Sequence, residues 1–134
     1  MIYESRIVSC VKGGVRTRRA NMRAVGTKGE DRAVFYLQEK GYVIVERNVY
    51  SRFGELDIVA KEGKTLVFVE VKFRSSLRGG NPTEAITYHK MRAMLQTARW
   101  YLYSRGYGEY TSCRFDLIGI LGDKITHLQN IIET

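Results

Sequence analysis

The stretch FGELDIVAKEGKTLVFVEVKFR, residues 53–74, predicts two β-strands joined by a short turn at EGK. Both runs are rich in the β-branched and aromatic side chains that strands favour, and the turn residues are polar. Charged residues interrupt the apolar runs at Asp57 in the first strand and at Glu70 and Lys72 in the second. A charge surrounded by a folded core is costly unless it is paired, so these positions require an explanation.

Alternation along the two strands predicts which side chains share a sheet face. In the second strand one face carries Leu66, Phe68, Glu70, Lys72 and Arg74, and the other carries Val67, Val69, Val71 and Phe73. In the first strand one face carries Glu55, Asp57 and Val59, and the other carries Leu56, Ile58 and Ala60. A hairpin about the EGK turn would bring Asp57 and Glu70 together as near neighbours on one face.

A divalent cation would remove the repulsion between two such carboxylates. Mg²⁺ prefers oxygen ligands, keeps several waters and usually takes only one or two carboxylates. Asp57, Glu70 and the backbone carbonyl of Val71 would supply half of such a shell, with water and a phosphate oxygen completing it. Lys72 would contact the attacking water or the negative charge that develops on the phosphoryl group.

The E-x-K spacing alone is weak support for this site. A second match, Glu62-Gly63-Lys64, lies in the turn and is interpreted as solvated. The match at Glu70 differs because it lies in the middle of a predicted buried strand, after a strand that carries an acid. The alternative is a structural ion pair between Glu70 and Lys72 or Arg74, and the pattern leaves it open.

Residues 27–41, TKGEDRAVFYLQEKG, predict a helix. Thr27 would cap its start, with Glu30 three residues later as in a capping box, and Gly41 would end it. Glu30 extends the buried stripe one turn toward the core. That stripe is Ala33, Val34 and Leu37.

The whole chain predicts an α/β fold, a mixed β-sheet flanked by helices in the order α-β-β-β-α-β-β. A second, longer helix should run from Pro82 to Arg105, with Asn81 as its N-cap and Gly106 at its end. Met, Leu, Ala and Tyr recur in it at helical spacing and predict a face packed on the sheet. The predicted strands are residues 42–50, 54–61, 65–74, 111–121 and 123–131.

The 134 residues carry a net charge of +8 that is concentrated at the N-terminus. Residues 1–28 hold seven Lys or Arg against one acid, leaving fifteen against thirteen for the rest. We therefore predict a basic, flexible arm over residues 1–25 and a single domain over residues 26–134. Such arms bind polyanions by counterion release, here through Arg16, Arg18 and Arg19. The alternative is a disordered leader, or an extension upstream of a start at Met22.

Other features predict a cytoplasmic protein. No apolar run approaches the roughly 20 residues of a membrane span, and the N-terminus lacks the apolar segment of a signal peptide. Cys10 and Cys113 are far apart and in no motif, which favours reduced thiols over a disulfide framework. His89 and His127 show no metal-ligand spacing and are interpreted as structural or solvated.

Several sequence blocks resemble the YraN family, which consists of small uncharacterised bacterial proteins considered endonuclease-like. The blocks are GTKGEDRA, RNVYSRFGELDIVA, FVEVKFR, GGNPTEAITYHK, RFDLIGI and ITHLQN, in this order over about residues 26–130. That family is similar to the restriction-endonuclease-like superfamily, especially archaeal Holliday junction resolvases. The resemblance implies a restriction-endonuclease-like fold and, by analogy with resolvases, a homodimer.

The resemblance also implies a site that uses a helix Glu, a strand Asp and an E-x-K motif with a divalent metal. These correspond to Glu30, Asp57 and Glu70-Val71-Lys72, with Mg²⁺ or Mn²⁺ as the cofactor. Leu56 precedes Asp57 where the superfamily has Pro. This departure does not affect the proposed chemistry, because the Pro takes no part in it. Glu30 agrees with its independently predicted place at the end of the buried stripe.

The remaining candidates have competing interpretations. Arg74, on the Glu70 face, would hold a phosphate or form a strand-end salt bridge. Lys90 would reach substrate or stay solvated. Arg114 and Asp116 share a strand face, where a structural ion pair is favoured.

The sequence thus predicts a metal-dependent, endonuclease-like protein that hydrolyses phosphodiester bonds in DNA, with branched or damaged DNA as candidate substrates. The first alternative is a non-catalytic nucleic-acid-binding module of the same fold. An RNA-directed enzyme is the second, and a structural domain whose acids form only ion pairs is the third.

Overall fold

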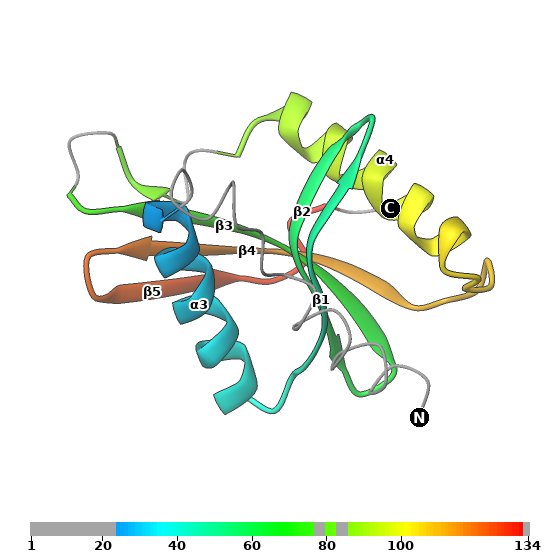
Figure 1. The fold of residues 1–134 in the computed structure, drawn as a ribbon, viewed down its shortest axis with the longest axis horizontal. Helices are drawn as coiled ribbons and strands as arrows, with labels where there is room; N and C mark the ends of the chain where they lie inside the picture. The colour runs from blue at the N-terminus through cyan, green and yellow to red at the C-terminus, as the bar shows by residue number, and fades with distance from the viewer. Residues whose placement is uncertain (1–23, 77–79, 83–85, 133–134) are drawn as a thin grey trace.

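Figure 1 shows the computed structural model of the chain, in which a five-stranded sheet packs between two helices. The structure describes residues 24–76, 80–82 and 86–132, with side chains from residue 29 onward in the first helix. The elements are α3 (Ala24–Glu39), β1 (Val43–Ser51), β2 (Gly54–Glu62), β3 (Thr65–Arg74), α4 (Tyr88–Ser104), β4 (Cys113–Leu121) and β5 (Lys124–Leu128).

The strands lie side by side in their order along the chain, β1-β2-β3-β4-β5. Every neighbouring pair is antiparallel except β3 and β4, which are parallel and are connected through α4. A parallel pair requires such a crossover, whereas the antiparallel pairs need only short turns. The predicted α/β class, the mixed sheet and the order α-β-β-β-α-β-β are confirmed.

Two hydrophobic clusters lie on opposite faces of the sheet, and each is covered by one helix. Alternating residues of β3 divide between them, so that Val67 and Val69 pack with α3 and Leu66 and Phe68 pack with α4. The helix stripes that cover the faces are Ala33 and Leu37 of α3, and Met94, Ala98 and Tyr101 of α4. Burying each large apolar side chain stabilises the fold by about 1.5–3 kcal/mol, so β3 is anchored from both sides.

β2 and β3 separate in the middle of the sheet. Their pairing ends at Ile58 and Val69, although β2 continues beside β1 and β3 continues beside β4 beyond this point. The β1–β2 hairpin then bends away from β3 toward α4 (Figure 1). Asp57 is the β2 residue next to Ile58, at the point where the gap between the two strands opens.

Both predicted helix starts are wrong. α3 begins at Ala24, so Thr27 lies inside the helix and does not cap it. α4 begins at Tyr88, and Thr87 caps it by accepting a hydrogen bond from the backbone N–H of Lys90 at 3.1 Å. Thr87 provides a side-chain acceptor for a free N–H group, which is the usual requirement of an N-cap, so the Asn81-Pro82 signal does not start this helix.

The predicted helix ends agree with the structure. Gly41 has φ +91° and its N–H donates to the carbonyl of Gln38, while the N–H of Tyr42 donates to Leu37 at 3.0 Å. Gly106, with φ +77°, follows the C-cap Arg105 of α4. These backbone conformations favour glycine, which explains why the helix ends were easier to predict than the starts.

No helix in the described part of the chain has the length and hydropathy that a membrane crossing requires. Arg16, Arg18, Arg19 and Cys10 lie outside the described residues. The basic arm, the division at residue 26 and the cytoplasmic location therefore stay predictions.

Candidate metal and phosphate site

Asp57 and Glu70 are buried together, with 9% and 3% of their surfaces exposed. Burial, followed by the negative charge of Glu70, raises the pKa of Asp57 well above its ordinary value. Both effects disfavour the ionised carboxylate, and the second requires the two side chains to lie near each other. Asp57 and Glu70 are also the next residues beyond the last β2–β3 pair, Ile58 and Val69, so the predicted closeness of the two acids agrees with the strand register.

Asp57 reaches its place because β2 leaves β3 at this residue. Its Oδ2 accepts a hydrogen bond from the backbone N–H of Val71 at 2.7 Å, in place of a strand partner. The N–H and C=O of one strand residue point to the same edge, so the Val71 carbonyl faces the same gap. Asp57 thereby lies beside the carbonyl that the sequence proposed as a ligand.

The strand faces around Asp57 differ from the prediction in one respect. Leu56 packs in the α4-side cluster, whereas Ile58 and Ala60 pack in the α3-side cluster. The predicted shared face of Leu56 and Ile58 is therefore wrong. Strict alternation assumes a continuously paired strand, and β2 loses its β3 neighbour between these two residues.

Glu70 points to the α4 face, where two ammonium groups approach one of its oxygens. Oε2 lies 3.8 Å from Lys72 Nζ and 3.3 Å from Lys90 Nζ. Oε1 is buried and, among the described residues, has no hydrogen-bond partner. A buried carboxylate oxygen without a donor is unfavourable in a folded protein, so this atom is available to a ligand.

The contact between Glu70 and Lys90 is the part of the site that sequence reasoning missed. The sequence predicts that Lys90 either contacts substrate or stays solvated, and it does not predict a contact with Glu70. Its closeness to Glu70 depends on how the first turn of α4 packs against β3, which no local pattern reveals. The absence of any acid in α4, together with its connection to the E-x-K strand, is the signal that could have indicated it.

Glu30 lies near enough to affect Asp57 but on the α3 side of the sheet, away from Glu70. Its Oε1 lies 3.5 Å from Nη2 of Arg47, which also donates to Asp31 at 2.7 Å. Glu30 contributes to the raised pKa of Asp57, after burial and Glu70, but α3 covers the sheet face opposite to the one that Glu70 enters. Within the described residues, no three His, Cys, Asp or Glu side chains form a group able to hold a metal. Glu30 as a ligand stays a prediction.

The types of oxygen around the gap fit a hard divalent cation. Two carboxylates, one with an unpaired oxygen, lie with a backbone carbonyl at a gap in the sheet. Mg²⁺ usually takes one or two carboxylates and keeps several waters, so a pair is a sufficient protein ligand set. Asp57, Glu70 and Val71 would hold Mg²⁺ or Mn²⁺ here.

Arg74 lies at the end of β3, half-buried, and its Nη1 donates to the carbonyl of Phe73 at 3.2 Å. Only the alternation of side chains along β3 assigns Arg74 to the Glu70 face. Its phosphate-binding role therefore stays a prediction. Lys72 is likewise half-buried near Glu70.

A third buried carboxylate, Asp116, lies on the α3 face and has hydrogen-bond partners for both of its oxygens. Arg114 donates two hydrogen bonds of 2.9 Å to Asp116, and the N–H of Asn130 donates a third at 3.0 Å. His127 Nε2 lies 2.7 Å from Asp116 Oδ2. Burial alone would raise the pKa of Asp116, but the hydrogen bonds from His127 and Arg114 hold it below its usual value. The predicted structural ion pair and the structural reading of His127 are confirmed.

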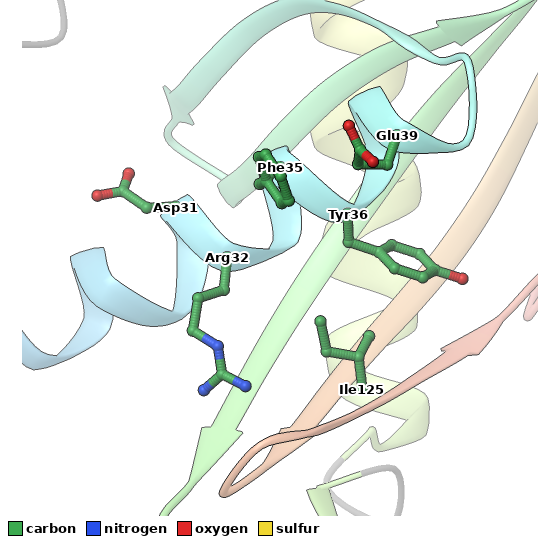
Figure 2. A pocket seen from close by; sticks show the side chains of 6 residues that line it. All are labelled: Asp31, Arg32, Phe35, Tyr36, Glu39 and Ile125. Carbon is green, nitrogen blue, oxygen red and sulfur yellow. The ribbon is translucent and has the colours of Figure 1, made fainter.

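A separate hollow of about 460 Å³ lies between α3 and β5 (Figure 2). The side chains of Phe35, Tyr36 and Ile125 form its apolar part, with charged residues of α3 around them. Phe35 is 65% exposed. None of its lining residues belongs to the Asp57–Glu70 pair, so the two features are distinct.

Comparison with known proteins places the chain in a family. Residues 29–120 match the uncharacterised protein family UPF0102. A UPF0102 protein of Lachnoclostridium phytofermentans is 43% identical over 113 residues, covering 84% of this chain and 96% of the relative. One from Persephonella marina is 44% identical over 108 residues, covering 81% and 92%. The chain belongs to the uncharacterised protein family UPF0102, which is the YraN family that its sequence blocks resemble.

Proposed function

We propose that this protein is a metal-dependent nuclease that hydrolyses phosphodiester bonds in DNA. The observation that carries the proposal is the buried Asp57–Glu70 pair. The pKa of Asp57 is raised, Oε1 of Glu70 has no hydrogen-bond partner among the described residues, and two ammonium groups lie near Glu70. Folding alone disfavours such a pair, because two buried like charges repel each other and lose their hydration. Perturbed carboxylates of this kind are more common at functional sites than elsewhere.

The acidic residues would bind the cofactor. Asp57 is held by the Val71 N–H through Oδ2, which leaves Oδ1 for a cation, and Glu70 offers its unpaired Oε1. The Val71 carbonyl completes the protein ligands. When bound, Mg²⁺ or Mn²⁺ would lower the pKa of a water and stabilise negative charge on the phosphoryl oxygens.

The basic residues would bind the substrate. Lys72 and Lys90 place two positive charges beside Glu70. A metal ion bound by Asp57 and Glu70 would weaken the contacts of both lysines with the Glu70 carboxylate. Lys72, on the strand that carries Glu70, would orient the attacking water or stabilise the developing charge. Lys90, on the first turn of α4, would hold a neighbouring phosphate, and Arg74 would extend this contact along β3.

A non-catalytic module is the alternative, in which the same residues hold nucleic acid without cleaving it. An RNA-directed enzyme and a purely structural role for the Asp57–Glu70 pair are the others.

A homodimer is proposed by analogy with resolvases, and sedimentation velocity of the full chain tests it.

The deciding experiment incubates the purified full chain with linear, single-stranded and four-way DNA, and with RNA, in Mg²⁺ or Mn²⁺. Asp57→Asn and Glu70→Gln keep the side-chain shapes and remove the charges, so they should abolish cleavage. Asp123→Asn and Glu39→Gln, on exposed residues, are the matched controls and should cleave normally. Glu30→Gln, assayed beside them, shows whether the helix acid takes part.

The outcomes separate the candidates. Binding without cleavage on every DNA supports the non-catalytic module, and cleavage of RNA alone supports the RNA-directed enzyme. Cleavage that survives both Asp57→Asn and Glu70→Gln overturns the proposed site.

A further inference from the structure

One face of α4 is turned away from the sheet and carries aromatic and basic residues. At 3.6 residues per turn, these positions fall within a sector of about 80° around the helix axis. They lie opposite the buried residues Met94, Thr97, Ala98 and Tyr101. The face, called here the α4 stripe, consists of Tyr88, Arg92, Gln96, Arg99 and Tyr103.

The α4 stripe is electrostatically one-sided. α4 contains no Asp or Glu, so no acid of the helix itself offsets Arg92 and Arg99. Both arginines are exposed. Exposed helix faces commonly mix both signs of charge in i, i+4 pairs, and this one does not. Its charge is complementary to a polyanion.

The aromatic rings at the two ends of the stripe are exposed to an unusual degree. Tyr88 is 74% exposed and Tyr103 is 87% exposed. Large apolar rings held at a surface beside arginines provide stacking platforms for nucleobases and cations for phosphates. Neither ring is needed to cover the sheet, because the buried side of α4 does that.

The tip of the β1–β2 hairpin lies against the middle of α4 and adds to this surface. A Cβ at Gly54 would lie 3.4 Å from the Cβ of Ala93, and Ser51 Oγ lies 3.0 Å from Thr97 Oγ1. These contacts fix the turn residues Arg52 and Phe53 beside the helix, with the guanidinium 5.0 Å from the ring centre. Figure 1 shows the hairpin tip next to α4.

The α4 stripe and the candidate site meet only at the N-terminal end of α4. Lys90, in the first turn of the helix, lies 3.3 Å from Glu70, and Tyr88 begins the stripe two residues earlier. Because two residues span about 200° around the helix axis, Lys90 faces the sheet while the stripe faces away from it. From Tyr88 to Tyr103 the helix rises about 22 Å, which is roughly six nucleotides at the 3.4 Å spacing of a stacked strand.

We propose that the α4 stripe binds the single-stranded DNA that adjoins the bond cleaved at the Asp57–Glu70 pair. The proposal rests on the proposed function for the direction of the strand: the scissile phosphate lies near Lys90, and the unpaired nucleotides pass round the N-terminal end of α4 onto the stripe. Tyr88 and Tyr103 stack on bases, and Arg92 and Arg99 neutralise phosphates. Duplex DNA keeps its base faces stacked inside the helix, so exposed rings favour an unpaired strand.

Fluorescence anisotropy with a labelled single-stranded oligonucleotide of about 20 nucleotides tests this, using the full chain in EDTA so that nothing is cut. Tyr88→Ala with Tyr103→Ala should weaken binding by at least tenfold, since stacking on each ring contributes substantially to affinity. Arg92→Gln with Arg99→Gln should reduce the salt dependence by about 0.7 per charge removed. Phe35→Ala, and Lys40→Gln with Lys124→Gln, are the matched controls on exposed residues outside α4 and should change neither quantity.

Several results would overturn the inference. Equal losses in the α4 variants and their controls, equal losses for duplex and single strand, or tighter binding of RNA of the same sequence would each do so. Conversion of a dimer to a monomer by the Tyr88 and Tyr103 changes would assign the face to a second copy of the chain. Because all four positions are exposed, circular dichroism should show an unchanged fold.

The test is separable from the proposed nuclease. Single-strand binding that depends on the α4 stripe, in a protein that cleaves nothing, supports the stripe and removes the nuclease. Cleavage that requires Glu70 but is unaffected by every α4 variant leaves the nuclease and removes the stripe.

Discussion

Two buried carboxylate sites on opposite faces of one sheet have opposite electrostatic surroundings. Asp116, on the α3 face, is fully buried and accepts hydrogen bonds from Arg114 and Asn130 while facing His127. Near the α4 face, Asp57 accepts one hydrogen bond from the Val71 N–H, and Glu70 Oε2 lies 3.8 Å and 3.3 Å from the ammonium groups of Lys72 and Lys90. The pKa of Asp116 is lowered, whereas that of Asp57 is raised.

This difference in pKa distinguishes Asp116, whose charge is stabilised by its surroundings, from Asp57, whose charge is disfavoured by its surroundings. Around Asp116, charge, hydrogen bonds and geometry all favour the ionised form, so no ligand is needed. Around Asp57, burial and the negative charge of Glu70 disfavour it. Such a locally unfavourable arrangement is expected at functional sites, where it is offset elsewhere in the structure.

The largest expected effect is on cleavage. Asp57→Asn or Glu70→Gln should lower the rate about a thousandfold or more, equivalent to about 4 kcal/mol of transition-state stabilisation, because each removes a metal ligand. Asp116→Asn should leave the rate per folded molecule unchanged. Single-turnover cleavage, normalised to the folded fraction, checks both, and equal losses in all three variants would erase the distinction between the sites.

The next effect is on stability. Asp116→Ala should lower the free energy of unfolding by about 3 kcal/mol, since it leaves Arg114 and His127 facing a site without its charge. Arg114 keeps its contacts with Glu62 and the Tyr42 hydroxyl, which limits the loss. Urea unfolding followed by circular dichroism measures it, and a loss below about 1 kcal/mol would mean that this network contributes little.

A smaller effect of the opposite sign is expected at the other site. Asp57→Asn, measured in EDTA, should raise the free energy of unfolding by about 1 kcal/mol, because it removes one of two repelling buried charges. The Asn carbonyl oxygen can still accept the Val71 N–H that Asp57 accepts. A clear loss of stability in the same urea experiment would show that the carboxylate is structural.

The pH dependence should sharpen the comparison further. Asp116 has a lowered pKa when folded, so the stability it provides is present above the unfolded value of about 3.9 and is lost as pH falls through its folded pKa. Asp57 has a raised pKa, so stability is greatest below about 3.9 and is lost as pH rises toward its folded pKa.

The variants make this pH dependence measurable. The penalty of Asp116→Asn should shrink on acidification, and the gain from Asp57→Asn should appear only on raising the pH. Urea midpoints across this range, in EDTA, check both trends. Parallel curves for wild type and both variants would contradict the assignment of opposite surroundings.

Much of the fold could be predicted because the deciding signals are local. Alternation along residues 65–74 places Glu70 on the α4 face, and the apolar repeat of α4 identifies Met94 and Ala98 as buried. The glycines at the helix ends were equally informative. The helix starts were not, since Asn81-Pro82 and Thr87 are both plausible signals and only packing selects Thr87.

The candidate site was less predictable because it depends on contacts between distant elements. The closeness of Asp57 and Glu70 follows from hairpin register, but the hydrogen bond from Val71 to Asp57 requires β2 to leave β3. Glu30 pointed to the core by periodicity, yet it lies near Arg47. Lys90 approaches Glu70 only through the packing of α4 on the sheet.

The most direct test of the two-carboxylate site is the binding of Mn²⁺ to the full chain by isothermal titration calorimetry. Wild type and Asp123→Asn should bind the ion with the same affinity, while Asp57→Asn and Glu70→Gln should bind it at least about tenfold more weakly. Equal affinities in all four proteins would contradict the account, as would a wild-type protein that takes up no Mn²⁺ with or without DNA.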